Sequence, residues 1–435
     1  MSFFMSIFNF QFSIFNSNSP LFLRIALREF RSIATSYSVL LVLVGGVFAY
    51  GLLYNYMYAP NVVREVPIAV VDHSGSALSR EYIRMLDATP EAHVAFRARD
   101  MLEARDLMSR ALVYGILYLP HDFEGRLLRG DESAYPFYAT TDAFLYYEAL
   151  SRANLEVMEA IDAEYRPRLM EFLPLPGLVS VATQRPVTVV GTALHNPLEG
   201  YGIYLIPSVL MLIIFQTLML LVAMQSGADC RYHRLAPYVR LRVAPARLAL
   251  SLVSGKTLTY TVLYLLFALF LVGLLPLLFD IPHGASWSVL SLLLVPYVVS
   301  TSLLGLALSR WYSDAEAPVL LIAFFSIGLI FLSGVSYPLE LMPWYWCVAH
   351  YLIPAPPAVL AYVALTGMDA TPRDMWPQLL TLYVQVPVYL TLALWTYRDL
   401  LRAEQKEMLP LTPKSVSVRA TRGRCPAGGS LPNPS

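Results

Sequence analysis

The chain has 435 residues, of which 57% are hydrophobic and only 14% are charged. Acidic and basic side chains are equal in number, so the formal net charge is +0, and we expect no nucleic-acid partner. A composition this apolar excludes an ordinary soluble enzyme. The three cysteines lie too far apart in the sequence to indicate a disulfide framework.

Six segments free of Asp, Glu, Lys and Arg are each long enough to cross a bilayer, which takes about 20 apolar residues as a helix. A charge at the centre of such a helix costs roughly 2.5–3.5 kcal/mol, so long charge-free runs indicate spans. The segments are residues 32–63, 200–228, 257–279, 284–309, 317–339 and 375–397. The sequence therefore predicts an α-helical polytopic membrane protein with six transmembrane helices, the first at 37–58 and the others within 200–400.

Basic residues are concentrated on one side of these spans. Three arginines precede the first span, six cations follow the second and seven follow the sixth, whereas residues 340–374 hold only Arg373. Positively charged flanks stay on the cytoplasmic side. We therefore expect a multi-pass protein of the inner (plasma) membrane, with both termini cytoplasmic and residues 59–199 outside.

Residues 1–36 are predicted to form a cytoplasmic tail with an amphipathic helix on the membrane surface, over Leu21–Arg31. One face of this helix is basic, with Arg24, Arg28 and Arg31. The other face is apolar, with Phe22, Ala26, Phe30 and Ile33. A solvated basic turn before the first span is the alternative. Residues 401–435 become rich in Pro, Ser, Gly and Arg after Met408 and predict a disordered cytoplasmic tail.

Between the first two spans, strand and helix patterns alternate, which is typical of a small α/β domain. Strands are predicted at 66–72, 93–96, 113–119, 136–140 and 186–190, and helices at 76–86, 100–112 and 142–172. The sequence thus predicts an extracytoplasmic α/β domain within residues 59–199, inserted between spans one and two.

Residues 341–368 are rich in apolar side chains, but they do not read as a seventh span. Pro354, Pro356 and Pro357 divide the segment into two pieces of about ten residues, each too short to cross a bilayer. We therefore predict a re-entrant helix pair on the outer side. Irregular backbone at membrane depth persists only where protein or a wet cavity surrounds it, so the pair is expected to pack against the bundle.

Several short motifs follow one another in a characteristic order. They are 68–72 (IAVVD) with 78–80 (LSR), 114–120 (YGILYLP) with 122–123 (DF), Asn196-Pro197, Ser333-Gly334, Tyr337-Pro338, Met342-Pro343, and Pro354 with Gly367. In the order of its parts, over about residues 20–400, the chain resembles the permease subunits of ABC exporters of the ABC-2 type.

The resemblance implies a permease half that pairs with a second half, identical or related, and with a cytoplasmic ABC ATPase subunit that binds ATP and Mg²⁺. No cofactor is then expected in this chain, which would be a transport subunit and not an enzyme. A periplasmic adaptor is a further partner, and membrane lipids surround the spans. Because the spans lack charges, a hydrophobic or amphipathic substrate is favoured, exported from the cytoplasm or the inner leaflet.

The loop predicted after the second span, residues 226–249, is where this family contacts its ATPase. Residues 225–234 (QSGADCRYHR) lack the acidic pair that is usual there, so position alone predicts the docking site. The predicted ATPase contacts are the basic residues Arg231, Arg234, Arg240 and Arg242. The alternative is that these cations only set the topology and touch anionic lipid.

Gly255-Lys256-Thr257 resembles the end of a phosphate-binding loop, but Leu250 replaces the glycine that such a loop requires and no strand precedes it. The charge-free segments hold no ionisable residue for ion-coupled transport. No catalytic, cofactor-binding or metal-ligating set is predicted. A non-transporting membrane scaffold or receptor, whose outer domain binds a partner, is the alternative function.

Three prolines fall inside predicted spans: Pro207, Pro296 and Pro387. They are candidate hinges for opening a transport pathway. A static kink, tolerated because neighbouring helices satisfy the freed backbone groups, is the alternative.

Overall fold

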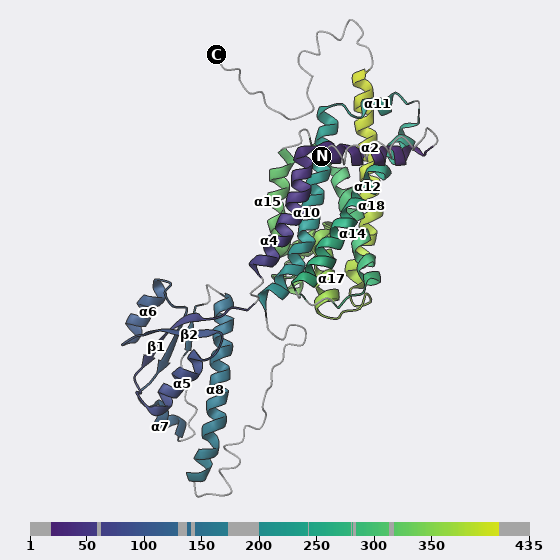
Figure 1. Cartoon of the computed structure of the whole chain (residues 1–435). Helices are drawn as coiled ribbons and strands as arrows, with labels where there is room; N and C mark the ends of the chain where they lie inside the picture. Colours follow the sequence, from purple (N-terminus) through teal and green to yellow (C-terminus); the bar gives the residue numbers. More distant parts are fainter. Residues whose placement is uncertain are drawn as a thin grey trace, which may run out of the picture. The chain divides into compact units, whose positions relative to one another are not determined.

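The computed structural model describes residues 19–58, 62–128, 137–140, 144–172, 200–241, 243–279, 281, 284–312 and 317–408. The chain falls into two compact units (Figure 1). One, here called the bundle, comprises Met1–Ala59 and Gly202–Ser435. The other, here called the inserted domain, comprises Pro60–Tyr201. The inserted domain is thus one continuous segment, whereas the bundle is built from two separate parts of the sequence.

Long apolar helices make up the bundle. The first span consists of α3 (Tyr37–Leu40), the π-helical η1 (Leu41–Ala49) and α4 (Tyr50–Met57). The other elements are α2 (Leu21–Thr35), α10 (Tyr201–Arg231), α11 (Ala236–Val239), α12 (Pro245–Ala268), η2 (Leu269–Leu274), α13 (Leu275–Leu278), α14 (Trp287–Ala307), η3 (Leu308–Trp311), α15 (Ala317–Leu332), η4 (Leu339–Leu341), α16 (Trp344–Leu352), α17 (Ala355–Gly367) and α18 (Trp376–Met408).

Five helices in the described part of the chain are long and apolar enough to cross a membrane. They are Tyr37–Met57, Tyr201–Arg231, Pro245–Leu278, Trp287–Trp311 and Trp376–Lys406. The prediction of a polytopic helical membrane protein is confirmed. The second of these helices, α10, is the central one, because 89% of its most apolar stretch is buried within the chain, compared with 22% for the first span.

The fifth predicted span, residues 317–339, is shorter than expected. Helix α15 ends at Leu332 after 16 residues, which gives a length of about 24 Å, against a hydrocarbon core of about 30 Å. It ends there because Gly334 adopts a left-handed φ of 87°, which terminates a helix. The Ser333 hydroxyl also donates to the Ile330 carbonyl oxygen at 2.6 Å. Five spans are therefore of full length, and the sixth apolar helix is short.

The segment 341–368 contains two helices, α16 and α17, which are bent by 86° at the break between them. Side chains of α18 satisfy backbone carbonyl groups next to the bend. Gln385 Nε2 donates to the Tyr351 carbonyl oxygen at 2.9 Å, and the Tyr389 hydroxyl donates to that of Leu352. Two carbonyl groups at the bend are thus satisfied by protein, as irregular backbone at membrane depth requires. Its re-entrant position in a membrane stays a prediction.

Two segments predicted as loop or tail are partly helical. Helix α10 continues to Arg231 and α12 begins at Pro245, so only residues 232–244 of the predicted loop 226–249 connect the two helices. Proline fits the first helical position because its missing N–H has no partner there in any case. Helix α18 runs to Met408, and Lys406 in its last turn complements the helix dipole. Residues 401–408 of the predicted tail are therefore helical, and residues 409–435, where the disorder is predicted, lie outside the described residues.

Helix α2 lies across one end of the bundle (Figure 1). We call this the α2 end. The residues that connect α10 to α12 lie there too, and His233 in this connection contacts Glu404 of α18, with Nδ1 3.1 Å from the carboxylate. Successive spans run in opposite directions, so Met57 of α4 and Tyr201 of α10 lie at the other end of the bundle. The chain therefore leaves the bundle for the inserted domain, and returns from it, at the end opposite α2.

The inserted domain is built on a four-stranded sheet with the order β2-β1-β3-β4. Strand β1 (Val66–Asp72) runs parallel to β2 (Ala92–Arg97) and β3 (Gly115–Leu119), and β4 (Phe137–Ala139) pairs antiparallel with β3. In the register of the central pair, Ile68 lies opposite Gly115. The helices are α5 (Ala77–Asp87), α6 (Met101–Ser109), α7 (Phe123–Leu128) and α8 (Phe144–Phe172).

Both faces of the central strand β1 are buried, which explains its continuous apolar sequence. Ile68 and Val70 pack in the larger core with α5, α7 and α8, whereas Ala69 and Val71 pack in a smaller core with α6. The predicted strand at 186–190 lies outside the described residues, as does Asn196-Pro197. The position of this domain outside the cytoplasm stays a prediction.

Candidate functional site

Helix α2 is held against the bundle by four buried side chains, Ile25, Ala26, Glu29 and Ile33. Ala26 and Ile33 belong to the predicted apolar face, whereas Phe22 from the same predicted face is 40% exposed. The arginines of α2 are exposed. The buried stripe thus runs along the helix with the spacing of one helical face, and an acidic residue lies within it.

Helices α2 and α12 are in close contact at Gly255. A Cβ atom at this position would lie 2.5 Å from the Phe22 carbonyl oxygen and 3.0 Å from the Ile25 Cβ, so only glycine allows the helices to approach this closely. One turn further along, Thr259 Oγ1 donates to the Ala26 carbonyl oxygen at 2.9 Å. The Gly255-Lys256-Thr257 motif is therefore part of a helix–helix contact.

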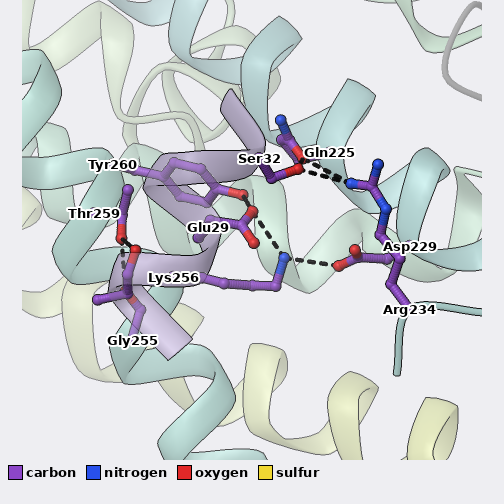
Figure 2. A network of polar contacts seen from close by, with 10 residues as sticks. Glu29, Ser32, Gln225, Asp229, Arg234, Gly255, Lys256, Thr259 and Tyr260 are labelled. Carbon is purple, nitrogen blue, oxygen red and sulfur yellow. Dashed lines mark hydrogen bonds and ion pairs between the residues drawn. The ribbon is translucent and has the colours of Figure 1, made fainter. Parts of the chain in front are cut away.

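Next to this glycine, the Lys256 ammonium group lies in a buried cluster of charges (Figure 2). Its Nζ lies 2.9 Å from Glu29 Oε1 and 2.7 Å from Asp229 Oδ2. The Tyr260 hydroxyl donates to the same oxygen of Glu29. Lys256, Glu29 and Asp229 are each less than a tenth exposed. The cluster thereby joins α2, the end of α10 and the first half of α12.

Taking charges out of water costs several kcal/mol per ion, and close partners offset that cost only where the geometry is good. In this cluster one ammonium group serves two carboxylates, so the loss of Lys256 leaves two buried carboxylates without their shared cation. The three elements are consequently held in one arrangement. After a displacement of α2 that separated Glu29 from Lys256, their attraction would no longer offset the cost of taking these charges out of water.

Sequence reasoning missed this cluster because its three members come from separate segments. Lys256 lies in a motif that resembles the end of a phosphate-binding loop, and Asp229 lies just beyond the charge-free segment 200–228. The usable signal was Glu29, which lies four residues after Ile25 and four before Ile33. A lone acid in the apolar stripe of an amphipathic helix indicates a buried cation on the helix it packs against.

Among models of known protein families, the one described as ABC-2 family transporter protein matches residues 37–395 of the chain. The chain belongs to this ABC-2 family. The resemblance inferred from the motifs is thus confirmed, and the chain is a multi-pass permease subunit of an ABC transporter. Permeases of this family work with ATPase partners. No curated protein matches the chain.

The predicted ATPase contacts of this ABC-2 permease lie in different surroundings. Arg234 lies next to the charge cluster, with Nη1 2.8 Å from Ser32 Oγ and 3.4 Å from Gln225 Oε1. Arg231, the last residue of α10, and Arg240, just after α11, are exposed at the α2 end. Arg242 lies outside the described residues. Whether any of these arginines contacts an ATPase stays a prediction.

The candidate hinges lie inside helices that continue through them: Pro207 in α10, Pro296 in α14 and Pro387 in α18. Pro296 has no N–H to donate to the carbonyl oxygen of Leu292, four residues earlier. The Tyr383 hydroxyl of α18 donates to that oxygen instead, at 3.2 Å. A carbonyl satisfied by a neighbouring helix is what a static kink requires, and a hinge role for these prolines stays a prediction.

In the part of the chain that the structure describes, no group of three or more His, Cys, Asp or Glu side chains is placed to hold a metal ion. The side chain closest to a phosphate-binding motif, Lys256, is engaged by Glu29 and Asp229. That ATP and Mg²⁺ are bound by the partner ATPase, and not by this chain, stays a prediction.

Proposed function

We propose that this permease is the membrane half of an ATP-driven exporter and that its ATPase docks at the α2 end of the bundle. One observation carries the coupling part of the proposal. Glu29, Lys256 and Asp229 join α2 to the ends of two spans through a buried cluster of charges. A force applied to α2 or to the connection between α10 and α12 is therefore transmitted to both spans.

Direct contacts between α2 and the connection that contains α11 would transmit this force. Helix α11 lies in the connection between α10 and α12, and Arg28 of α2 stacks over Tyr238 of α11, with its guanidinium carbon 5.0 Å from the ring centroid. Arg234, just before α11, bonds to Ser32 of α2. An ATPase that closed against this surface would move α2, α11 and the end of α10 together. Since α10 is the most enclosed span, its movement would rearrange the centre of the bundle.

The charge pattern supports the proposed orientation. The basic flanks of the spans support a cytoplasmic α2 end, and the opposite end, where the chain leaves for the inserted domain, would then face the outside of the inner membrane. A periplasmic adaptor is a further proposed partner on that side of the membrane. A second permease half, identical or related, would complete the path for a hydrophobic or amphipathic substrate.

Charge removal at the exposed surface tests docking. Arg231→Ala and Arg240→Ala together should reduce ATPase co-purification and transport, because both side chains are exposed at the α2 end. Arg373→Ala is the matched control, since Arg373 is an exposed arginine before α18, at the opposite end. If the double variant retains its ATPase, its transport and its substrate-stimulated hydrolysis, the docking surface lies elsewhere.

The source of energy is tested on the chain alone. The purified permease should not hydrolyse ATP, and hydrolysis should appear when the co-purifying ATPase is added. ATP hydrolysis by the permease alone that persists in Lys256→Met would reveal a nucleotide site in this chain and contradict the proposal.

A further inference from the structure

The α2 end contains a cavity of about 230 Å³ between α2, the end of α10, the residues around α11 and the first half of α12. A water molecule takes about 30 Å³ in the liquid, so the cavity is several times larger than one water. Its charged lining consists of four cations and two carboxylates: Arg28, Arg31, Arg234, Lys256, Glu29 and Asp229. The lining therefore carries two more positive than negative charges.

The carboxylates of the cavity are already paired. Lys256 lies within 2.9 Å of both Glu29 and Asp229, so it neutralises one of the two carboxylate charges and leaves one negative charge in this group. The guanidinium groups of Arg28, Arg31 and Arg234 form no ion pair within the part of the chain that the structure describes. The three arginines and this group of Lys256 and two acids together leave the cavity with two positive charges that no anion among the described residues neutralises.

The guanidinium groups also come from two directions, and those of Arg28 and Arg234 are held in place. Arg28 and Arg31 are three residues apart on α2 and therefore lie on neighbouring positions of one face. Arg28 stacks over the Tyr238 ring on the other side, at 5.0 Å. Arg234 is held by Ser32 and Gln225, whose own hydrogen bond from Ser32 Oγ to Gln225 Oε1 measures 3.0 Å. Hydrogen-bonded and stacked arginines lose less rotamer freedom when they bind a ligand.

We propose that this cavity binds the phosphate group of an anionic membrane phospholipid. Guanidinium groups match the geometry of phosphate oxygens, and basic pockets between helices on the cytoplasmic side of a membrane bind lipid headgroups. The same cavity has an apolar wall of Ile25, Leu235 and Leu252, which suits the glycerol and the first methylenes of a lipid better than a free ion. The lipid would bridge α2 to α11 and thereby stabilise the α2 end.

The test uses the purified full-length permease in a non-ionic detergent, without an ATPase, so it is independent of the docking experiment. Thermal unfolding is measured with added phosphatidylglycerol, phosphatidylcholine or inorganic phosphate. We expect phosphatidylglycerol to raise the Tm and the other two additions to leave it unchanged. A rise of equal size with phosphatidylcholine overturns the proposal, and an equal rise with inorganic phosphate overturns the assignment to a lipid.

Single charge removals locate the site. Arg28→Gln and Arg31→Gln should each lose most of the rise in Tm that phosphatidylglycerol causes. Arg24→Gln removes the same charge from the same helix, but Arg24 does not line the cavity, and this variant should keep the rise. All three side chains are exposed, so the variants should fold. Equal losses in all three variants overturn the site, and native mass spectrometry of bound phosphatidylglycerol provides the second measurement.

Discussion

The ammonium nitrogen of Lys256 lies 2.7 Å from the carboxylate of Asp229, although the two residues belong to different apolar helices. Asp229 lies two residues before the end of α10, and Lys256 lies eleven residues inside α12. The ion pair therefore links α10 and α12 directly, in addition to the residues 232–244 that connect them in the sequence. The addition of Glu29 extends the same fastening to α2.

The first prediction concerns Lys256. In Lys256→Met, the Glu29 and Asp229 carboxylates would face each other without a cation, so we expect the free energy of unfolding to fall by about 3–5 kcal/mol. Thermal unfolding in detergent measures this. Lys406→Met, which removes an exposed lysine from α18, is the control and should leave the Tm nearly unchanged. Neutralising the acids as well, in Glu29→Gln/Asp229→Asn/Lys256→Met, should restore most of the free energy of unfolding that Lys256→Met loses. A triple variant as unstable as the single one would contradict the charge argument.

The second prediction concerns the contact at Gly255. Alanine usually stabilises a helix interior by up to about 1 kcal/mol relative to glycine. Gly255→Ala should nevertheless destabilise the protein and expose α2 to proteases, because the new Cβ would overlap the Phe22 carbonyl oxygen. Gly328→Ala in α15 is the matched control, since a Cβ there meets nothing within 4 Å. Unchanged protease resistance of α2 in Gly255→Ala would show that the helices have room to spare.

The third prediction concerns Pro296 and its neighbour. Tyr383→Phe removes the hydroxyl that donates to the Leu292 carbonyl oxygen and should cost about 0.6 kcal/mol of unfolding free energy, the mean for such bonds in membranes. In Pro296→Ala, the restored N–H can donate to the same oxygen, so Tyr383→Phe should cost much less in that background. A double-mutant cycle of unfolding free energies measures the difference. Equal costs in both backgrounds would mean that the hydroxyl does not replace the missing donor.

The fourth prediction concerns topology. A reporter that is active only in the cytoplasm should be active when fused after Leu409 and inactive when inserted at Gly130. The basic flanks of the spans provide the physical reason. Activity at Gly130 without activity after Leu409 would invert the orientation and move the proposed docking surface to the outside.

The spans could be predicted from the sequence because a hydrocarbon core sets a length and excludes charge, and both requirements are visible in a single segment. The α/β pattern of the inserted domain was visible for a similar reason, since β1 is apolar throughout and α5 begins at a serine N-cap, Ser76. The helix ends were less predictable. Absence of charge does not mark where α15 stops, because a left-handed turn at Gly334 ends it within an apolar run.

The charge cluster could not be predicted in the same way. Glu29, Asp229 and Lys256 become neighbours only when three helices pack, and single-segment patterns contain no information on that packing. Gly255 and Lys256 suggested nucleotide chemistry by their order in the sequence. Their environment in α12 assigns them a packing role and a charge-pairing role.

The separation of Glu29 and Lys256 along the chain, 227 residues, has a consequence for biogenesis. A ribosome adding 5–20 residues per second needs roughly 10–50 seconds to make the intervening segment. During that interval two spans and the whole inserted domain are synthesised while the acid on α2 has no lysine to pair with. The α2 helix can therefore dock only after the third span has emerged, which makes its docking a late step of assembly.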